Sequence, residues 1–174
     1  EIEGYAIMGK TARRPKTLTV YFVAQFDKPF KSIKGWRKGE LEELVNDQIE
    51  GELIGGYVSF ATQTNEVRKM KVGISFVSKE QARMNINSEL PHWEFEQCVS
   101  DSQEEWNSWL SRIEIEGGTD LEQRRFYTDL WHALLGRRII SDFNGKYIDN
   151  TGSISRIGQI PLDDNAKPKF NHYN

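Results

Sequence analysis

Hydrophobic residues at every second position indicate that the first part of the chain is built from β-strands. In "TLTVYFVAQF" the alternating apolar positions are Leu18, Val20, Phe22, Ala24 and Phe26. The same period of two returns in "VRKMKVGISFVS", where the apolar positions are Met70, Val72, Ile74 and Phe76. We expect two further strands in "EIEGYAIMG" and "GGYVSFAT".

The segment from Lys31 to Gly51 is polar and charged, and we expect a surface excursion there with a short helix at "GELEELVND". Strands that follow one another without intervening helices favour antiparallel sheets. The first 78 residues therefore predict an antiparallel arrangement, most simply a portion of a β-sandwich.

The pattern changes to a helical period at Ser78. Ser78 and Gln81 are spaced as a capping box, in which each side chain bonds the backbone N–H of the other residue. Apolar residues then recur every four positions until Pro91 ends the helix. A second helix is expected from about Glu94 to Ser111, with an apolar stripe of Phe95, Cys98, Val99, Trp106, Trp109, Leu110 and Ile113.

Thr119 and Glu122 form a second capping box, which predicts the start of a third helix. Its apolar residues are Phe126, Tyr127, Leu130, Trp131, Leu134 and Leu135, and Gly136 is expected near its end. Before this helix, "RIEIEGG" predicts a short strand and a break. After it, Asn144-Gly145 predicts a hairpin beginning at Ile139, and the chain beyond Tyr147 is expected to be loop. The fold class predicted is α+β.

The amino-acid composition excludes several classes of binding partner and of structure. The 174 residues carry 23 Lys and Arg against 26 Asp and Glu, a formal net charge of -3, so no basic face indicates nucleic acid or an anionic membrane. No apolar run reaches the roughly 18 residues of a membrane span. One cysteine excludes an internal disulfide. The chain opens at Glu1 without a leader and stops at "KFNHYN", and we expect a piece of a longer protein.

Several motifs of known chemistry do not match. The glycine after Asp142 comes too early for an EF-hand calcium loop, and His92, His132 and His172 lack the paired spacing of a zinc site. Cys98 lies on an apolar stripe without a histidine one turn away, which favours a buried, inert thiol. The residues alone assign no metal ligand.

The aromatic residues and Asp142 leave alternatives open. Trp106 and Trp109 fit a sugar-stacking platform, but their place on the apolar stripe favours core packing. Trp131 and His132, near the end of the third helix, are candidate substrate-binding residues. Asp142 follows that helix closely, and it fits equally a ligand-binding acid and an Asx-turn cap.

Three stretches resemble the α-mannosidases of glycoside hydrolase family 92. They are "KVGISFVSKEQARMNINSELPHWEFEQCVSDSQEEWNSWLSRIEIEGG", "FYTDLWHALLGRRIISDFNGKY" and "KPKFNHYN". The motifs Val-Gly-Ile-Ser-Phe-Val-Ser, Phe-Tyr-Thr-x-Leu-(aromatic)-His and Ser-Asp-x-x-Gly-x-Tyr occur in the family's order. The resemblance covers residues 56–174 well and the first 55 weakly.

This resemblance implies an order of domains and an activity. Residues 1–78 would be the C-terminal part of an N-terminal β-sandwich, 79–118 a helical linker, and 119–174 the first helix and loops of an (α/α) catalytic toroid. The implied activity is exo-acting, inverting hydrolysis of α-mannosides in mannose-containing glycans, aided by calcium. The family's catalytic acid, base and calcium ligands lie further along the toroid, so none is assigned here, and family analogy implies a secreted or periplasmic protein.

One site residue follows from the resemblance. The aspartate of the Ser-Asp-x-x-Gly-x-Tyr motif, here Asp142, lies in the region that lines the terminal mannose pocket and is expected to bond sugar hydroxyls. Asn144 and the "GRR" before "IIS" depart from the family pattern and bear on linkage preference. The alternative is a non-catalytic β-sandwich module that binds carbohydrate or scaffolds a partner. The sequence gives no oligomeric state.

Overall fold

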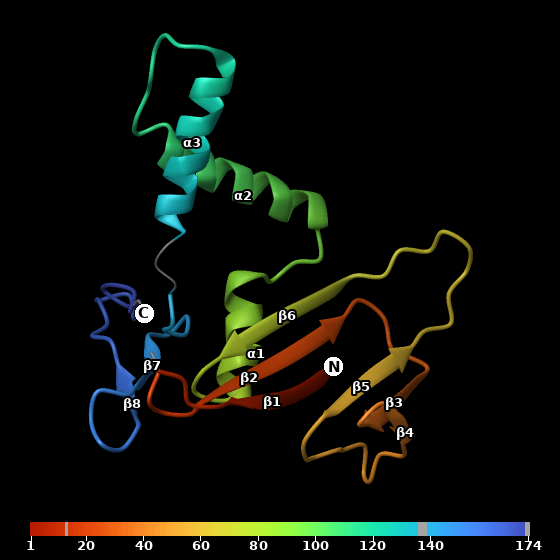
Figure 1. Ribbon diagram of the computed structural model, residues 1–174. Helices are drawn as coiled ribbons and strands as arrows, with labels where there is room; N and C mark the ends of the chain where they lie inside the picture. Colours follow the sequence, from red (N-terminus) through yellow and green to blue (C-terminus); the bar gives the residue numbers. More distant parts are fainter. Residues whose placement is uncertain (13, 136–138, 173–174) are drawn as a thin grey trace. The chain divides into compact units, whose positions relative to one another are not determined.

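The computed structural model describes residues 1–12, 14–135 and 139–172, which form strands followed by helices and a final strand pair (Figure 1). The chain divides into two compact units. The first contains Glu1 and Ala24–Lys71, and the second contains Ile2–Val23 and Val72–Asn174. The predicted α+β fold class, with antiparallel sheets followed by helices, is confirmed.

The first unit holds a small antiparallel sheet in the order β4-β3-β5. Its strands are β3 (Ser32–Arg37), β4 (Glu40–Glu42) and β5 (Ile54–Ser59). The register places Trp36 opposite Leu41 on one side and Gly55 on the other. A Cβ at Gly55 would overlap the Trp36 indole, so the glycine lets that ring lie against the neighbouring strand.

The expected excursion between Lys31 and Gly51, with its short helix, is wrong, because β3 and β4 form a hairpin there. Lys38 and Gly39 have φ angles of 50° and 87°, which is the left-handed pair that a two-residue hairpin loop requires. The Nε of Arg37 then donates to a carboxylate oxygen of Glu42 at 2.6 Å across the hairpin. Cross-strand pairing therefore overrides the helical propensity of "GELEELVND".

A second sheet has the order β1-β2-β6, formed by β1 (Ile2–Met8), β2 (Leu18–Phe26) and β6 (Met70–Ser75). Helix α1 (Lys79–Glu89) packs on it, and Val23, Ala82 and Ile86 form the buried apolar core. A Cβ at Gly73 would overlap the Ala82 carbonyl and the Ile86 side chain. The helix therefore lies directly against the backbone of β6.

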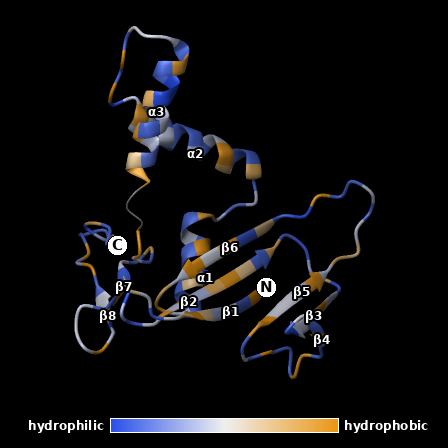
Figure 2. Ribbon diagram, viewed as in Figure 1, coloured by the Kyte–Doolittle hydropathy of each residue, from blue (hydrophilic) through white to orange (hydrophobic). Residues whose placement is uncertain are grey.

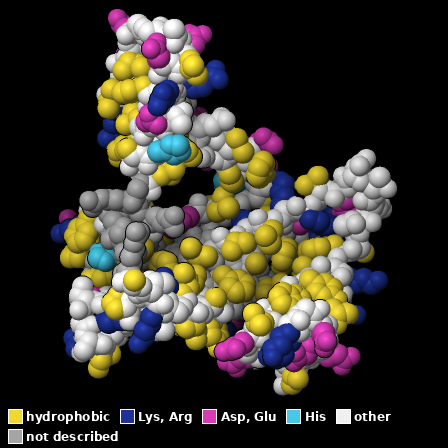
Figure 3. Space-filling model, viewed as in Figure 1, with side chains coloured by type: hydrophobic (Ala, Val, Ile, Leu, Met, Phe, Trp, Pro, Cys, Tyr) yellow, Lys and Arg dark blue, Asp and Glu magenta, His cyan; other side chains and the backbone are white. Residues whose placement is uncertain are grey.

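The apolar side of β6 is the exposed side. Met70, Val72 and Ile74 are 60%, 53% and 55% exposed, whereas Lys71 and Ser75 are buried. The alternation is as predicted from sequence, but α1 occupies the polar side because Gly73 leaves room for it. Figure 2 shows hydrophobic positions along much of these strands, and Figure 3 shows hydrophobic side chains gathered over this sheet.

Helices α2 (Phe95–Leu110) and α3 (Asp120–Leu134) follow, close to the predicted spans. Gly136, expected near the end of the third helix, lies outside the described residues. The capping box of Thr119 and Glu122 is confirmed with both of its hydrogen bonds. At the start of α1, the Ser78 hydroxyl oxygen accepts from the Gln81 N–H at 3.2 Å. The prediction of a reciprocal bond from the Ser78 N–H to the Gln81 side chain is wrong, because Gln81 Oε1 has no hydrogen-bond partner among the described residues. The strand expected in "RIEIEGG" is also wrong, because that segment is irregular.

The final elements are β7 (Lys146–Asp149) and β8 (Arg156–Gln159), an antiparallel pair where loop was expected. The Tyr147 ring lies where a side chain on Gly158 would be, and these two residues face each other in the register. The predicted hairpin about Asn144-Gly145 is wrong, because that turn precedes β7 without a strand before it among the described residues. Among the described helices, none has the length and apolar character needed to cross a membrane.

Candidate functional site

Asp142 begins a tight turn between the third helix and β7. Its backbone N–H donates to the Lys146 carbonyl at 2.7 Å, and the Gly145 N–H donates to the Asp142 carbonyl at 2.8 Å. Gly145 has a φ of 82°, a left-handed conformation that glycine adopts without strain. The Asn144 side-chain oxygen accepts from the Lys146 N–H at 3.2 Å. The turn 142–146 is thus closed by its own backbone and one amide side chain.

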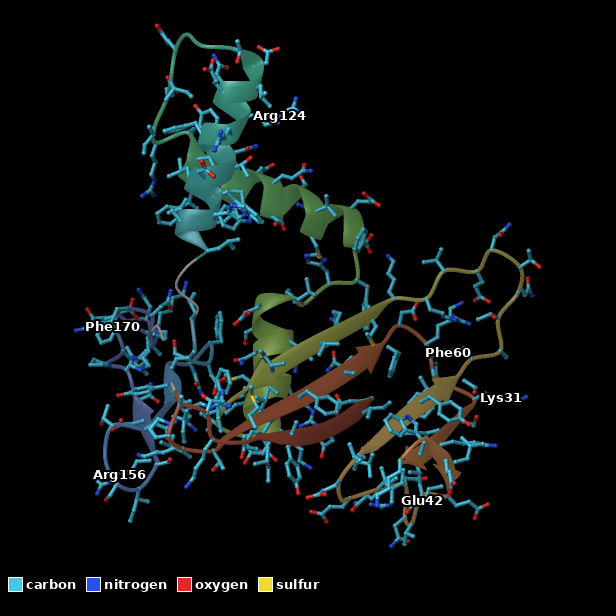
Figure 4. All side chains as sticks on the ribbon, viewed as in Figure 1. Lys31, Glu42, Phe60, Arg124, Arg156 and Phe170 are labelled. Atoms are coloured by element: carbon cyan, nitrogen blue, oxygen red, sulfur yellow. The ribbon has the colours of Figure 1, made fainter. Side chains whose placement is uncertain are left out.

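The Asp142 carboxylate is buried within the protein. The residue is 5% exposed, in contrast to surface charges such as Arg124 on α3 and Arg156 at the start of β8 (Figure 4). Ser75 Oγ donates to Asp142 Oδ2 at 2.9 Å, and Asn85 Nδ2 donates to Asp142 Oδ1 at 2.9 Å. Both carboxylate oxygens therefore have a protein donor, as a buried charge requires.

The two donors are themselves held by backbone groups. Asn85 Oδ1 accepts from the Phe143 N–H at 2.9 Å, and its Nδ2 also donates to the Ile74 carbonyl at 2.9 Å. Ser75 Oγ accepts from the Val77 N–H at 2.9 Å. Ser75 ends β6 and Asn85 lies in α1, so the carboxylate connects a strand, a helix and a turn.

Burial sets the acidity of this group. Loss of hydration raises the pKa of Asp142, and the hydrogen bonds from Asn85 and Ser75, with the charge of Lys146, counter that rise in part. Burial also raises the pKa of Glu89 in the last turn of α1, and the neighbouring charge of Asp142 adds to it. The two carboxyl groups therefore bind protons more readily than isolated ones.

Trp131 and His132 lie together on α3. The Trp131 ring contacts Trp106 of α2 edge to face, with 6.1 Å between centroids, and lies 4.9 Å from the His132 ring. Trp131 is 37% exposed. No described contact joins either residue to Asp142. Their assignment to substrate binding stays a prediction.

The other candidates of the second helix have local partners. Trp106 is half-buried and its ring contacts Trp131 of α3, whereas Trp109 is 41% exposed, so the core packing predicted for Trp109 is wrong. The Trp109 ring lies 3.8 Å from the Arg112 guanidinium, and its Nε1 donates to Glu105 at 2.7 Å. Cys98 was expected to be buried, but it is half-buried, and α2 as a whole has no fully buried residue.

Sequence reasoning missed Ser75 and Asn85. Asn85 lies between Ala82 and Ile86 on the face of α1 that packs on the sheet, and it is buried. A polar residue on an apolar helical stripe is a signal that could have been used, since burying an amide without partners is costly. Ser75 gave no such signal, because it fits the polar side of an alternating strand.

Comparisons with known families and structures decide the membership of this chain. A family model described as the glycosyl hydrolase family 92 N-terminal domain matches residues 1–75. A second, the glycosyl hydrolase family 92 catalytic domain, matches residues 81–171, more than half of the chain. The chain belongs to glycosyl hydrolase family 92. The match to the N-terminal domain ends at residue 75 and the match to the catalytic domain begins at residue 81. The finer division of the chain at residues 78 and 118 stays a prediction.

Individual relatives share the fold over most of the chain. An inverting mannosidase of family 92 from Bacteroides thetaiotaomicron has 26% sequence identity and a TM-score of 0.71, over 84% of this chain and 20% of its own. The family 92 glycosyl hydrolase ccman5 has 22% identity and a TM-score of 0.80, over 99% of this chain and 21% of its own. The second likeness, at its lower identity, supports the fold.

A curated relative matches a shorter stretch. It is an uncharacterized secreted glycosidase of Arthroderma benhamiae, with 28% identity over 98 residues, 53% of this chain and 12% of that protein. The chain thus spans about a fifth, or less, of the length of these relatives.

Proposed function

We propose that this chain is part of an exo-acting α-mannosidase that hydrolyses the α-mannosides of glycans with inversion of configuration. The observation that carries the proposal is the succession of both family 92 domains along one chain. The 26% identity to an inverting mannosidase over 84% of the chain supports mannosides as the substrate class.

An inverting glycosidase uses two carboxyl groups about 6.5–9.5 Å apart, one as general acid and one to activate water. Asp142 does not suit either role in this chain, because both its oxygens accept hydrogen bonds from Ser75 and Asn85. We assign no catalytic residue within the chain and place the acid and base elsewhere in the longer protein. The contribution of this chain is then to build the frame and part of the substrate pocket.

Calcium is part of the proposal for the longer protein. Calcium binds oxygen ligands and can hold sugar hydroxyls. The described residues contain no group of three or more His, Cys, Asp or Glu side chains that could hold a metal ion, so they do not fit such a site. No step assigned to this chain involves the ion, and its ligands are proposed to come from other parts of the protein.

Trp131 and His132 are the proposed substrate contacts of this chain. Trp131 is part-exposed, and the face of an aromatic ring is suited to the apolar face of a pyranose. Direct sugar contact by Asp142, which the family resemblance implies, is the competing hypothesis, and it would require a sugar hydroxyl to reach a carboxylate that is 5% exposed. A secreted or periplasmic location is proposed because a related glycosidase is described as secreted.

The test is mannose release from α-mannosides by this chain and by the longer protein that contains it, each with calcium and with a chelator. We expect release only by the longer protein with calcium, and the first sugar detected by proton NMR should be the β-anomer. Retention of the α-anomer would contradict inversion, and activity in chelator would contradict the calcium requirement. Binding of mannosides without hydrolysis by the longer protein would favour the non-catalytic module instead.

A further inference from the structure

The hydrogen bonds around Asp142 join three segments that are distant in the sequence. Ser75 ends the segment matched by the family's N-terminal domain, whereas Asn85 and Asp142 lie in the segment matched by the catalytic domain. We propose that Ser75, Asn85 and Asp142 form a buried cluster, the domain-joining cluster, in which Asp142 is a positioning residue that fixes the turn 142–146 instead of binding the sugar. This inference rests on the proposed mannosidase function for its activity readout.

The other hydrogen bonds of Asn85 and Ser75 determine which of their atoms donate to Asp142. The Phe143 N–H can only donate, so the Asn85 side-chain oxygen must face it, and the amide nitrogen must face Asp142 and the Ile74 carbonyl. Ser75 Oγ accepts from the Val77 N–H, and an ionised carboxylate can only accept, so the Ser75 hydroxyl hydrogen is directed at Asp142. Two donors therefore converge on one side chain.

A short carboxylate meets the requirement of two converging donors. A residue between two donors must accept on both sides, and each Asp142 oxygen does so at 2.9 Å. An asparagine would direct its amide hydrogens at Ser75 or at Asn85, and a buried donor facing a donor is left unsatisfied. A glutamate is one methylene longer and would displace the turn or the helix.

Hydrogen bonds and ring contacts connect the domain-joining cluster to neighbouring residues outside it. Asn85 anchors the Phe143 N–H, and Phe143 is 46% exposed at the tip of the turn. Ser141, the residue before Asp142, accepts from the His172 N–H at 3.3 Å, and the His172 ring lies 4.2 Å from the Tyr147 ring at the start of β7. Displacement of Asp142 would therefore move an exposed aromatic residue and the His172 segment together.

The test compares Ser75→Ala, Asn85→Ala and Asp142→Asn in the longer protein. Kinetics with an α-mannoside are measured well below the melting temperature of every variant, with the folded fraction determined by circular dichroism. Asp163→Asn is the matched control, because Asp163 caps an exposed turn by accepting from the Asn165 and Lys167 N–H groups. The control is expected to keep its kcat/KM.

We expect all three cluster variants to lower the melting temperature and, per folded molecule, to lower kcat/KM by about tenfold to a hundredfold, the effect of a displacement near 1 Å at a reacting site. The Ser75→Ala and Asp142→Asn double variant should lose less than the sum of the two single variants, because Ser75 and Asp142 share one hydrogen bond. Ser75→Ala removes only one hydroxyl, so it keeps the test decisive if Asp142→Asn fails to fold.

Two results would overturn the inference. Loss of activity in Asp142→Asn alone, with an unchanged melting temperature and with normal Ser75→Ala and Asn85→Ala variants, would establish a direct sugar contact. Full activity per folded molecule in all three variants would leave the cluster with a purely structural role. Failure of the proposed function is separate, because a wild-type protein that releases no mannose still reports whether Ser75→Ala and Asp142→Asn are coupled in unfolding.

Discussion

Glu89 is an exposed residue whose carboxyl group nevertheless loses part of its hydration and lies near a second negative charge. It ends α1, a helix with no basic residue in its last turn, and its pKa is raised by burial and by the charge of Asp142. A negative charge at the C-terminus of a helix also opposes the helix dipole. Each of these effects disfavours the ionised form of Glu89 in the folded protein.

This residue predicts a pH dependence of stability. Because the folded pKa of Glu89 lies above its ordinary value of 4.5, its contribution to the unfolding free energy is full below pH 4.5 and is lost as the pH rises through the folded pKa. Glu89→Gln removes that loss, so at pH 7 the variant should be more stable by about 0.3–1 kcal/mol, the size of a helix-dipole effect.

The measurement is urea unfolding of both proteins from pH 4 to pH 7. The stability difference should shrink as the pH falls toward 4. Glu96→Gln is the control, since Glu96 lies in the first turn of α2, where a negative charge is favourable. A Glu89→Gln variant that is less stable than the wild type at pH 7 would contradict the assignment.

At the scale of an element, Gly73 determines how α1 packs on its sheet. A Cβ at this position would overlap the Ala82 carbonyl and the Ile86 side chain. Gly73→Ala should therefore push the helix from the strand and cost about 1–3 kcal/mol, the usual cost of overpacking. Urea unfolding measures it against Gly9→Ala, where a Cβ would meet nothing within 4 Å. Equal stability of the two variants would show that α1 is not in direct contact with β6.

The start of α3 depends on its capping box. Neither α2 nor α3 has a fully buried residue, so α3 gains little from packing among the described residues, and its capping bonds carry more weight. Thr119→Ala removes the acceptor for the Glu122 N–H and should destabilise the chain by about 0.5–2 kcal/mol. Thermal unfolding followed by circular dichroism tests this. The control is Thr128→Ala, whose hydroxyl donates to the Arg124 carbonyl inside the same helix and should matter less.

Local signals explain which elements could be predicted from the sequence. Strands with a period of two and helices with Ser or Thr caps were located to within a few residues, because their determinants are neighbours in the chain. The β3–β4 hairpin was missed because Lys38 is an unusual residue for a left-handed turn. The β7–β8 pair was missed because Gly158 weakens the strand pattern, and its role depends on the Tyr147 ring across the pair.

The candidate site was predictable only in part, for a similar reason. Asp142 was identified from its motif, but its partners Ser75 and Asn85 are separated from it by 67 and 57 positions. No local pattern encodes such a contact, because it arises only when α1 packs on β6. The sequence therefore located the acid without indicating that its carboxylate is directed into the protein.

At the scale of the whole molecule, the family's two domains are joined within this chain by more than the peptide bond. The match to the N-terminal domain ends at residue 75, the serine that donates to Asp142. The match to the catalytic domain supplies the other two members of the cluster. A boundary drawn between residues 75 and 81 would thus divide a buried hydrogen-bond network.

The bond from Ser75 to Asp142 has a consequence for how such proteins can evolve. An exchange of either segment with that of a distant relative would bring together halves that have not been selected for one another, and an aspartate without its serine would leave a poorly compensated charge in the interior. Recombination at this junction is thereby penalised, and Ser75 and Asp142 are expected to change together or not at all. The two segments are therefore expected to be inherited as one unit, although two family models match them.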